Sequence, residues 1–424
     1  MLYEVSTLAN GLRVVTSTMP HTRAASLLVY YKVGSRYEPA PLSGISHYIE
    51  HMLFKGTHKR PEPQEISEAI EGVGGSLNAV TDREYTAYTA QVPARHFERA
   101  LDVVTDMITN SRFAEDEVER ERSVITEEIN GVLDSPPDIV NELIDSLIWG
   151  DQPIGRPVAG TRETVGAITR AQMLEWLQSH YLPQNCVVTV AGNIEHAQVV
   201  GAVQATLGAA GDGRAAPDYP AAAVGQDAPR LGLATKDTEQ THLCVGLPAL
   251  SYVDPDRYVQ QMLDGILGGG MSSRLFVEIR EKRALAYSVA SYVDSLHDTG
   301  GFIVYAGVDN DRVTHCVRAV MHELDRMRQA PPPVDELNKV KEYYKGHLVL
   351  GLEGSRSVAG WGGRQVLLLD EIDTVDEVME RIDAVTPAAV QDLAQRLFRD
   401  DQLSLGLVGP FEETEAFREL LTIR

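Results

Sequence analysis

The chain repeats one order of secondary-structure elements in its two halves, and this repeat restricts the possible folds more than any other feature. Residues 207–230 are rich in Ala, Gly, Pro and Asp, which suits an exposed connection, and they divide the 424 residues almost in half. We therefore expect an N-terminal domain over 1–206, a linker over 207–230 and a C-terminal domain over 231–424.

Each half reads as a strand, a helix, a helical segment leading into a strand, a further strand, two helices and a closing strand. The first strand and helix are AASLLVYYKVG and SGISHYIEHML in the first half, and THLCVGLPAL and DRYVQQMLDGIL in the second. Strands and helices gathered in this order predict an α+β fold. We expect two structurally similar domains, each a mainly antiparallel sheet covered by helices.

Composition describes a folded, acidic chain. An apolar fraction of 43% is typical of globular proteins, and a net charge of −23 repels nucleic acid and anionic lipid. The N-terminus lacks a signal-peptide pattern, and no run approaches the roughly 20 apolar residues that a bilayer requires. The three cysteines have no metal-ligand spacing and read as packed thiols, in keeping with a reducing compartment. These features predict a cytoplasmic protein without nucleic-acid or membrane partners.

One predicted helix carries a cluster of ionisable side chains on an otherwise apolar background. In GISHYIEHMLFKGT, His47 and His51 lie four residues apart, so both rings can reach one point in space. Imidazole nitrogen suits Zn²⁺, and a catalytic zinc takes three protein ligands and leaves one position for water. Glu50 projects beside the two rings, where it could accept a proton from metal-bound water. H-x-x-E-H is the inverted zinc-protease signature, or inverzincin motif.

The alternative is an amphipathic helix whose polar stripe happens to contain histidine. The repeat bears on this choice, because the second half has QMLDG at residues 261–265, where the first has HYIEH. That segment keeps the helical pattern without the imidazoles. The fold therefore does not need them.

A third ligand is expected on the helix predicted over residues 114–133. Apolar residues recur there with the helical period and define a buried stripe. Glu121 and Glu128, seven residues apart, share the edge of that stripe, whereas Glu127 projects almost opposite to it. This geometry selects Glu128 as the ligand and makes Glu121 a carboxylate that could orient a ligand imidazole. A solvated acidic helix remains an equal alternative for Glu121.

At these residues the chain resembles the M16 (pitrilysin) family of zinc peptidases, in its bacterial and mitochondrial processing-peptidase branch, M16B. The matching segments, which fall across both halves, are HYIEHMLFKGT, GGSLNAVTDREYTAY, ERERSVITEEI, GGGMSSRLF and REKRALAYSV. The resemblance implies that His47, His51 and Glu128 bind one Zn²⁺ per chain. It further implies that Glu50 is the catalytic base and that Glu121 is a carboxylate outside the ligand set that orients a ligand imidazole.

The resemblance also implies roles in substrate binding. Asn78 and Ala79 match a sheet edge that binds substrate as an added strand, although an ordinary strand after a Gly-Gly turn fits the residues equally well. Arg280 and Tyr287 match a pair that in relatives reaches the substrate and the scissile carbonyl, where such donors suit a developing oxyanion. Without the resemblance they would read as a surface arginine and a half-buried tyrosine.

Assembly follows from the same resemblance, since two such two-domain units face one another as a clamshell in the family. A chain with both the zinc motif and the Arg/Tyr pair resembles a homodimer whose sites are completed by the partner chain. LGGGMSSRL resembles a short form of the glycine-rich segment of noncatalytic processing subunits, which leaves a heterodimer open. Alternatively, its glycines simply end the helix at Leu267.

The sequence therefore predicts a zinc-dependent endopeptidase of the M16B type. It would hydrolyse peptides or unfolded polypeptide segments in an enclosed chamber, with a metal-bound water as nucleophile and Glu50 as general base. One alternative is a noncatalytic M16-like partner or structural subunit, which usually lacks intact ligands. Another is a metal-dependent hydrolase of a nonpeptide substrate, against which the strand-like GGSLNAVT argues.

Overall fold

The computed structural model describes residues 3–209, 216–223 and 225–423. The chain forms two compact units, each assembled from three segments of the sequence. The segments of the first unit are Met1–Ile129, Pro157–Pro220 and Leu348–Val375. Those of the second are Asn130–Arg156, Ala221–His347 and Asp376–Arg424.

The first unit is built on a six-stranded sheet of order β1-β2-β6-β3-β5-β4. All neighbouring strands are antiparallel except β2 and β6, which are parallel. In chain order the strands are β1 Glu4–Thr7, β2 Arg13–Thr18, β3 Ala24–Tyr31, β4 Ser76–Thr81, β5 Thr86–Pro93 and β6 Cys186–Gly192. Strand β4 lies at an edge of this sheet, so one side of its main chain has no neighbouring strand within the sheet.

Helices cover both faces of the first sheet. Alternate residues of β3 point to opposite faces, so that Leu27 and Val29 pack with α1 and α3, while Leu28 and Tyr30 pack with α12. Burial on both faces explains why β3 is apolar along its whole length except at Ser26. The helices of this unit are α1 Ile45–Leu53, α2 Pro63–Glu71, α3 Phe97–Asn110, most of α4 Glu115–Asp134, α6 Arg162–Ala167, α7 Arg170–His180, α8 His196–Leu207 and α12 Ser355–Leu369.

The second unit repeats this design with a five-stranded sheet of order β7-β11-β8-β10-β9. Its order matches that of β2-β6-β3-β5-β4, including the single parallel pair, here β7 with β11. Its strands are β7 Arg230–Thr235, β8 Gln240–Ala249, β9 Ala286–Ser295, β10 Gly300–Asp309 and β11 Ser404–Gly409. The predicted α+β fold, with two similar and mainly antiparallel sheets covered by helices, is confirmed.

The helices of the second unit include a direct counterpart of α1. Helix α9 carries the QMLDG segment and is largely buried, so this helix position packs without histidines. The segment that leads into β9 is a π-helix, Phe276–Lys282. The α-helices are α5 Pro136–Trp149, α9 Arg257–Leu267, α10 Val313–Gln329, most of α11 Val334–Gly351, α13 Val375–Ala384, α14 Pro387–Leu397 and α15 Glu415–Arg418.

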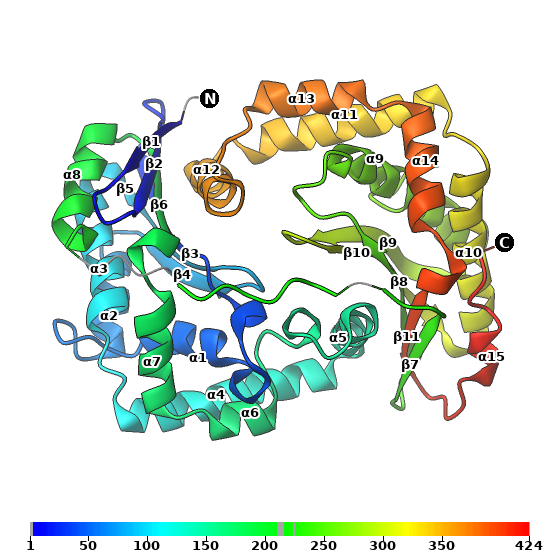
Figure 1. Cartoon of the computed structure of the whole chain (residues 1–424), viewed down its shortest axis with the longest axis horizontal. Coiled ribbons are helices and arrows are strands. Elements are labelled where there is room, and N and C mark those ends of the chain that lie inside the picture. Colours follow the sequence, from blue (N-terminus) through cyan, green and yellow to red (C-terminus); the bar gives the residue numbers. More distant parts are fainter. Residues whose placement is uncertain (1–2, 210–215, 224, 424) are drawn as a thin grey trace. The chain divides into compact units, whose positions relative to one another are not determined.

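The two halves of the sequence exchange one helix each, which can be followed in Figure 1. Helix α5, from the first half, packs on β8 and β11 and buries Ile144 and Ile148 there. Helix α12, from the second half, packs on β3 and β6 and buries Val358 and Val366. The compact units thus differ from the uninterrupted segments expected over 1–206 and 231–424. Helical periodicity shows that a helix buries one face, but not which sheet that face meets.

The predicted linker is only partly described. Residues 216–223 have no regular secondary structure, whereas positions 210–215 and 224 of the expected linker lie outside the described residues. All three cysteines are buried free thiols, as predicted. Within the described part of the chain, no helix combines the length and apolar character needed to cross a bilayer.

Candidate metal centre

Helix α1 is fixed at its N-terminus by a glycine and a buried carboxylate. The two oxygens of Glu38 accept hydrogen bonds from the main-chain N–H groups of Gly44, at 2.7 Å, and Ser46, at 2.8 Å. These bonds satisfy donors that a helix N-terminus leaves unpaired. Gly44 has φ +94°, and a Cβ added there would lie 2.5 Å from the carbonyl oxygen of Ala159. The start of α1 therefore has little freedom to shift.

The remaining face of α1 packs into the core of the first unit and connects it to α4. The Tyr48 hydroxyl, which is fully buried, donates a hydrogen bond to the main-chain carbonyl of Val118 on α4. The other buried apolar side chains of α1 are Ile45, Ile49, Met52 and Leu53. This packing holds the helix that carries both histidines against the helix that carries Glu128.

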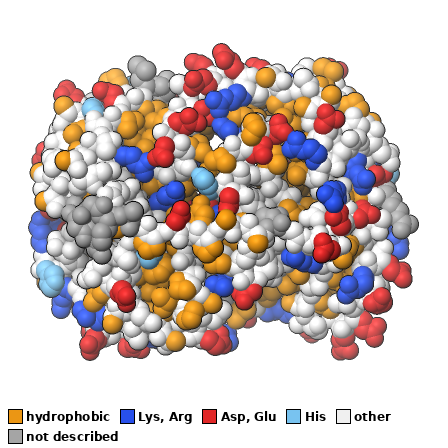
Figure 2. Space-filling model, viewed as in Figure 1, with side chains coloured by type: hydrophobic (Ala, Val, Ile, Leu, Met, Phe, Trp, Pro, Cys, Tyr) orange, Lys and Arg blue, Asp and Glu red, His pale blue; other side chains and the backbone are white. Residues whose placement is uncertain are grey.

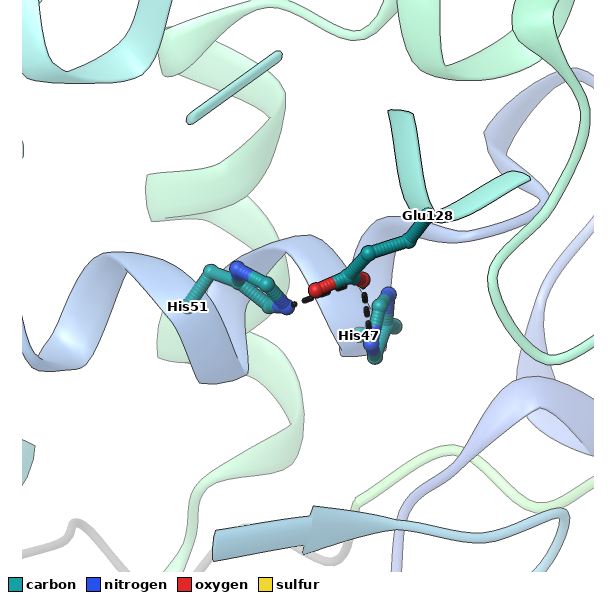
Figure 3. Close-up of side chains that lie close together, drawn as sticks. All are labelled: His47, His51 and Glu128. Carbon is teal, nitrogen blue, oxygen red and sulfur yellow. Dashed lines mark ion pairs between the residues drawn. The ribbon is translucent and has the colours of Figure 1, made fainter. Parts of the chain in front are cut away.

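The structure brings His47, His51 and Glu128 together. Oε2 of Glu128 lies 3.7 Å from Nε2 of His47 and 3.4 Å from Nε2 of His51. Figure 3 shows the carboxylate between the two imidazole rings, which α1 presents from successive turns. One ligand atom from each residue lies within 4.8 Å of the other two. Residues more than 70 positions apart in sequence thus converge on one point.

These separations suit a bound zinc ion. Zn²⁺ in proteins is usually tetrahedral, with bonds of about 2.1 Å to nitrogen and oxygen, so neighbouring ligand atoms lie about 3.4 Å apart. Two of the three separations here, 3.4 Å and 3.7 Å, are close to that value. Two imidazoles and one carboxylate also form one of the donor sets found in catalytic zinc sites. The residues present fit the ion.

A second carboxylate holds one of these imidazoles in place. Oε2 of Glu121 lies 3.0 Å from Nδ1 of His51, and its other oxygen, Oε1, lies 2.7 Å from Nζ of Lys55. The Glu121 side chain is only 3% exposed. Burial raises its pKa, but the hydrogen bonds from His51 and Lys55 outweigh burial and leave the pKa below its usual value. An anionic Glu121 accepts the Nδ1 proton of His51 and leaves Nε2 free to bind a metal.

The two histidines differ in their electrostatic surroundings. Burial, followed by the neighbouring His51, lowers the pKa of His47 to about 4, so this ring is neutral at pH 7. Burial also lowers the pKa of His51, but the hydrogen bond to Glu121 and the charge of Glu128 overcome this effect and raise it. Nδ1 of His47 is buried and has no hydrogen-bond partner among the described residues. Glu121 therefore orients one of the two rings.

Glu50 lies on the same helix and is held by strand β4. Oγ1 of Thr81 donates a hydrogen bond of 2.6 Å to Oε2 of Glu50. Burial raises the pKa of Glu50, and the bond from Thr81 only partly opposes this effect. Thr81 is the last residue of the edge strand, while Asn78 and Ala79 precede it on that strand. The predicted base and the predicted substrate-binding edge are therefore in direct contact.

Arg280 and Tyr287 belong to the other compact unit, where they lie against one another. Cζ of the Arg280 guanidinium lies 4.7 Å from the centre of the Phe276 ring and 4.6 Å from that of the Tyr287 ring. The Tyr287 side chain is 76% exposed, which differs from the half-buried tyrosine read from the residues alone. Their predicted role in catalysis stays a prediction.

Sequence reasoning gave no role to two residues that contact the centre, Lys55 and Thr81. Both lie inside segments that carried the family resemblance, HYIEHMLFKGT and GGSLNAVTDREYTAY. The available signal was weak, because a lysine beyond a helix end and a threonine at a strand end are common surface residues. Only the packing of α1 against α4 and β4 gives them partners.

Comparisons with known proteins identify the family of this chain. Residues 13–162 match the family model described as insulinase (peptidase family M16), and residues 167–344 match that of the peptidase M16 inactive domain. An uncharacterized zinc protease of Streptomyces coelicolor is 41% identical, over 97% of this chain and 91% of its own length. The uncharacterized zinc protease YmxG of Bacillus subtilis is 35% identical, over 95% and 97%.

Solved structures share the fold at lower identity. The crystal structure of a protease from Helicobacter pylori superposes with a TM-score of 0.92 at 24% identity, covering 96% of this chain and all of that one. A peptidase M16 inactive domain from Pseudomonas fluorescens gives 0.90 at 18% identity, over 97% of this chain and 98% of its own. On the strength of the family models and the extended identity to relatives, this chain belongs to peptidase family M16.

Proposed function

We propose that this protein is a zinc-dependent endopeptidase of the M16B type that hydrolyses peptides or unfolded polypeptide segments. One observation carries the proposal: ligand atoms of His47, His51 and Glu128 lie within 4.8 Å of one another, with Glu50 on the same helix as both histidines. The zinc-protease names of the relatives that align over nearly the whole chain support it.

In this mechanism His47, His51 and Glu128 would hold one Zn²⁺ per chain. When bound, zinc acts as a Lewis acid and makes water a nucleophile near neutral pH. Glu50 takes a proton from the attacking water and passes it to the leaving amine. Thr81 fixes Oε2 of Glu50 by a hydrogen bond. Burial raises the pKa of Glu50 toward neutral pH, where a general base is most effective.

The substrate binds as an extended strand along β4. Main-chain pairing at a sheet edge accepts many sequences but requires an extended segment. Ala79 is two residues before Thr81, or about 7 Å along a strand, so a segment paired there runs past Glu50. Folded proteins are therefore poor substrates.

The active enzyme is proposed to be a homodimer that encloses its substrate in a chamber, with a heterodimer as the alternative. Arg280 and Tyr287 of one chain would complete the site of its partner, where a guanidinium and a phenol can stabilise an oxyanion. Tyr287 is exposed and Arg280 packs against its ring, which supports the proposal that this pair can contact a partner chain.

The charge distribution supports a peptide rather than a nucleic acid as substrate. The net charge is −23, and acidic and basic side chains are interspersed across the face seen in Figure 2. A polyanion gains affinity from clustered Lys and Arg, which this face does not gather into one area. The cytoplasmic location stays a prediction.

Removal of the third ligand tests the proposal directly. We expect Glu128→Gln to lower the zinc content of purified protein and to reduce cleavage of a mixed peptide library by at least about 100-fold, because a neutral amide is a weak zinc ligand. The exposed neighbour Glu127 provides the matched control, and Glu127→Gln should keep both zinc and activity. A chelator should abolish wild-type cleavage. Retention of zinc and activity by Glu128→Gln would exclude the assigned site.

Mixed dimers test the sharing of sites between chains. A Glu50→Gln chain and an Arg280→Ala chain are each expected to be inactive as homodimers, because each lacks one part of every site. Subunit exchange between them should restore about a quarter to a half of wild-type activity, because a hybrid dimer carries one complete site. If exchange is confirmed by mass and no activity returns, the site is not shared in this way.

A further inference from the structure

Beyond the three ligands, a line of contacts runs through Glu121 to a lysine. Nζ of Lys55 lies 2.7 Å from Oε1 of Glu121, and Oε2 of Glu121 lies 3.0 Å from Nδ1 of His51. On the far side of the ring, Nε2 of His51 lies 3.4 Å from Glu128. Lys55 is thus two contacts away from His51, one of the proposed metal ligands.

The burial of Glu121 makes its two partners important. Its side chain is only 3% exposed, and an ionised carboxylate in such surroundings needs a cation or several donors. Among the residues that the structure describes, one oxygen is paired with Lys55 and the other with His51. An imidazole must be neutral to bind a metal, so Lys55 supplies the full positive charge in this pair.

We propose that Lys55 is a positioning residue that acts through Glu121 to keep the His51 proton on Nδ1 and to direct Nε2 at the metal. This proposal rests on the proposed function, because that function identifies the bound metal as zinc. Lys55 fixes Oε1 of Glu121. This contact orients the carboxylate so that its other oxygen, Oε2, stays against Nδ1 of His51. Without the ammonium group, the carboxylate loses the contact that fixes its orientation, and His51 gains access to the tautomer with its proton on Nε2. That tautomer cannot bind the metal through Nε2.

The competing explanation is an ion pair that only stabilises the fold. The same loop offers a matched control, since Nζ of Lys59 lies 2.6 Å from Oδ1 of Asp102, with 58% of the lysine side chain and 45% of the aspartate side chain exposed. An exposed pair of this kind contributes little. Lys59→Met removes the same charge four residues further along the chain and has no contact with Glu121.

The first experiment uses metal-free protein and requires no activity. Proton–nitrogen NMR on protein with isotope-labelled histidines, in mildly alkaline buffer, reports which ring nitrogen carries the proton. Wild-type protein, Lys55→Arg and Lys59→Met should all show His51 protonated on Nδ1. Lys55→Met should show a mixture of tautomers or the Nε2–H form. An unchanged His51 tautomer in folded Lys55→Met protein would overturn the proposal.

The second experiment measures zinc affinity by competition with a chromophoric chelator. Lys55→Met and Glu121→Gln should each weaken zinc binding by about 10- to 100-fold, the usual effect of losing an outer partner of a ligand. The double variant should bind no more weakly than Glu121→Gln, because Lys55 acts only through that carboxylate. If the losses of zinc affinity in the two single variants add up in the double variant, Lys55 does not act through Glu121. If wild-type protein binds no zinc, the proposed function fails, while the tautomer comparison still decides the role of Lys55.

Discussion

Glu50→Gln is expected to bind zinc as the wild-type protein does and to lose nearly all peptidase activity. The amide keeps the size of the side chain and can still accept the hydrogen bond from Thr81, but it cannot take a proton from water. Loss of a general base typically costs about 10²- to 10⁴-fold in rate. The effect should appear in kcat, measured with a fluorogenic peptide, while metal analysis gives one zinc per chain.

The design separates chemistry from binding. Glu50 lies on the same helix as both histidines but is not one of the three converging residues, so metal content should not follow activity in this variant. Glu127→Gln serves as the control for a glutamate replaced on the other helix. Cleavage by Glu50→Gln at the wild-type rate would show that another group acts as the base.

A single polar substitution in the second half of the sequence is expected to disrupt the first compact unit. Val358 of α12 is fully buried in a cluster with Val15, Leu28 and Tyr30. Val358→Asp would bury an unpaired carboxylate there, which we expect to cost about 3 kcal/mol or more. Zinc binding should weaken with the loss of this unit, although Val358 lies more than 200 residues in sequence from His47, His51 and Glu128.

The neighbouring residue gives the control for this experiment. Ser357 is exposed on the same helix, so Ser357→Asp should leave the thermal midpoint and the zinc content unchanged. A fragment of residues 1–206 lacks α12 altogether, and it should aggregate or fail to bind zinc because the face of its sheet with Leu28 and Tyr30 is uncovered. A stable zinc-binding fragment would show that α12 is dispensable.

Local patterns were enough to predict the repeated strands and helices of each half and the convergence of His47, His51 and Glu128, whose role as metal ligands stays a prediction. The helical spacing of His47, His51 and Glu50 and the seven-residue spacing from Glu121 to Glu128 are properties of single helices, so they can be read from the sequence alone. The order of four strands in each half was similarly visible as runs of apolar residues, whereas β1, β2 and β7 were not predicted. These features depend on contacts near in sequence or on a repeated pattern.

The parts that escaped prediction depend on tertiary packing. Lys55 contacts Glu121 and Thr81 contacts Glu50 because α1 packs near α4 and β4, and no periodicity encodes which side chain a carboxylate will meet. The sheets on which α5 and α12 pack could not be predicted for the same reason, because this packing is tertiary. An amphipathic helix specifies that it needs an apolar surface, but either sheet provides one.

The exchange of α5 and α12 has a consequence for the integrity of the molecule. A peptide-bond break within residues 216–223 would sever the covalent link between the halves. Helix α5 of the first piece would still be packed in the core of the second, and helix α12 of the second piece in the core of the first. Such a nicked molecule should elute as one species until a denaturant separates its fragments.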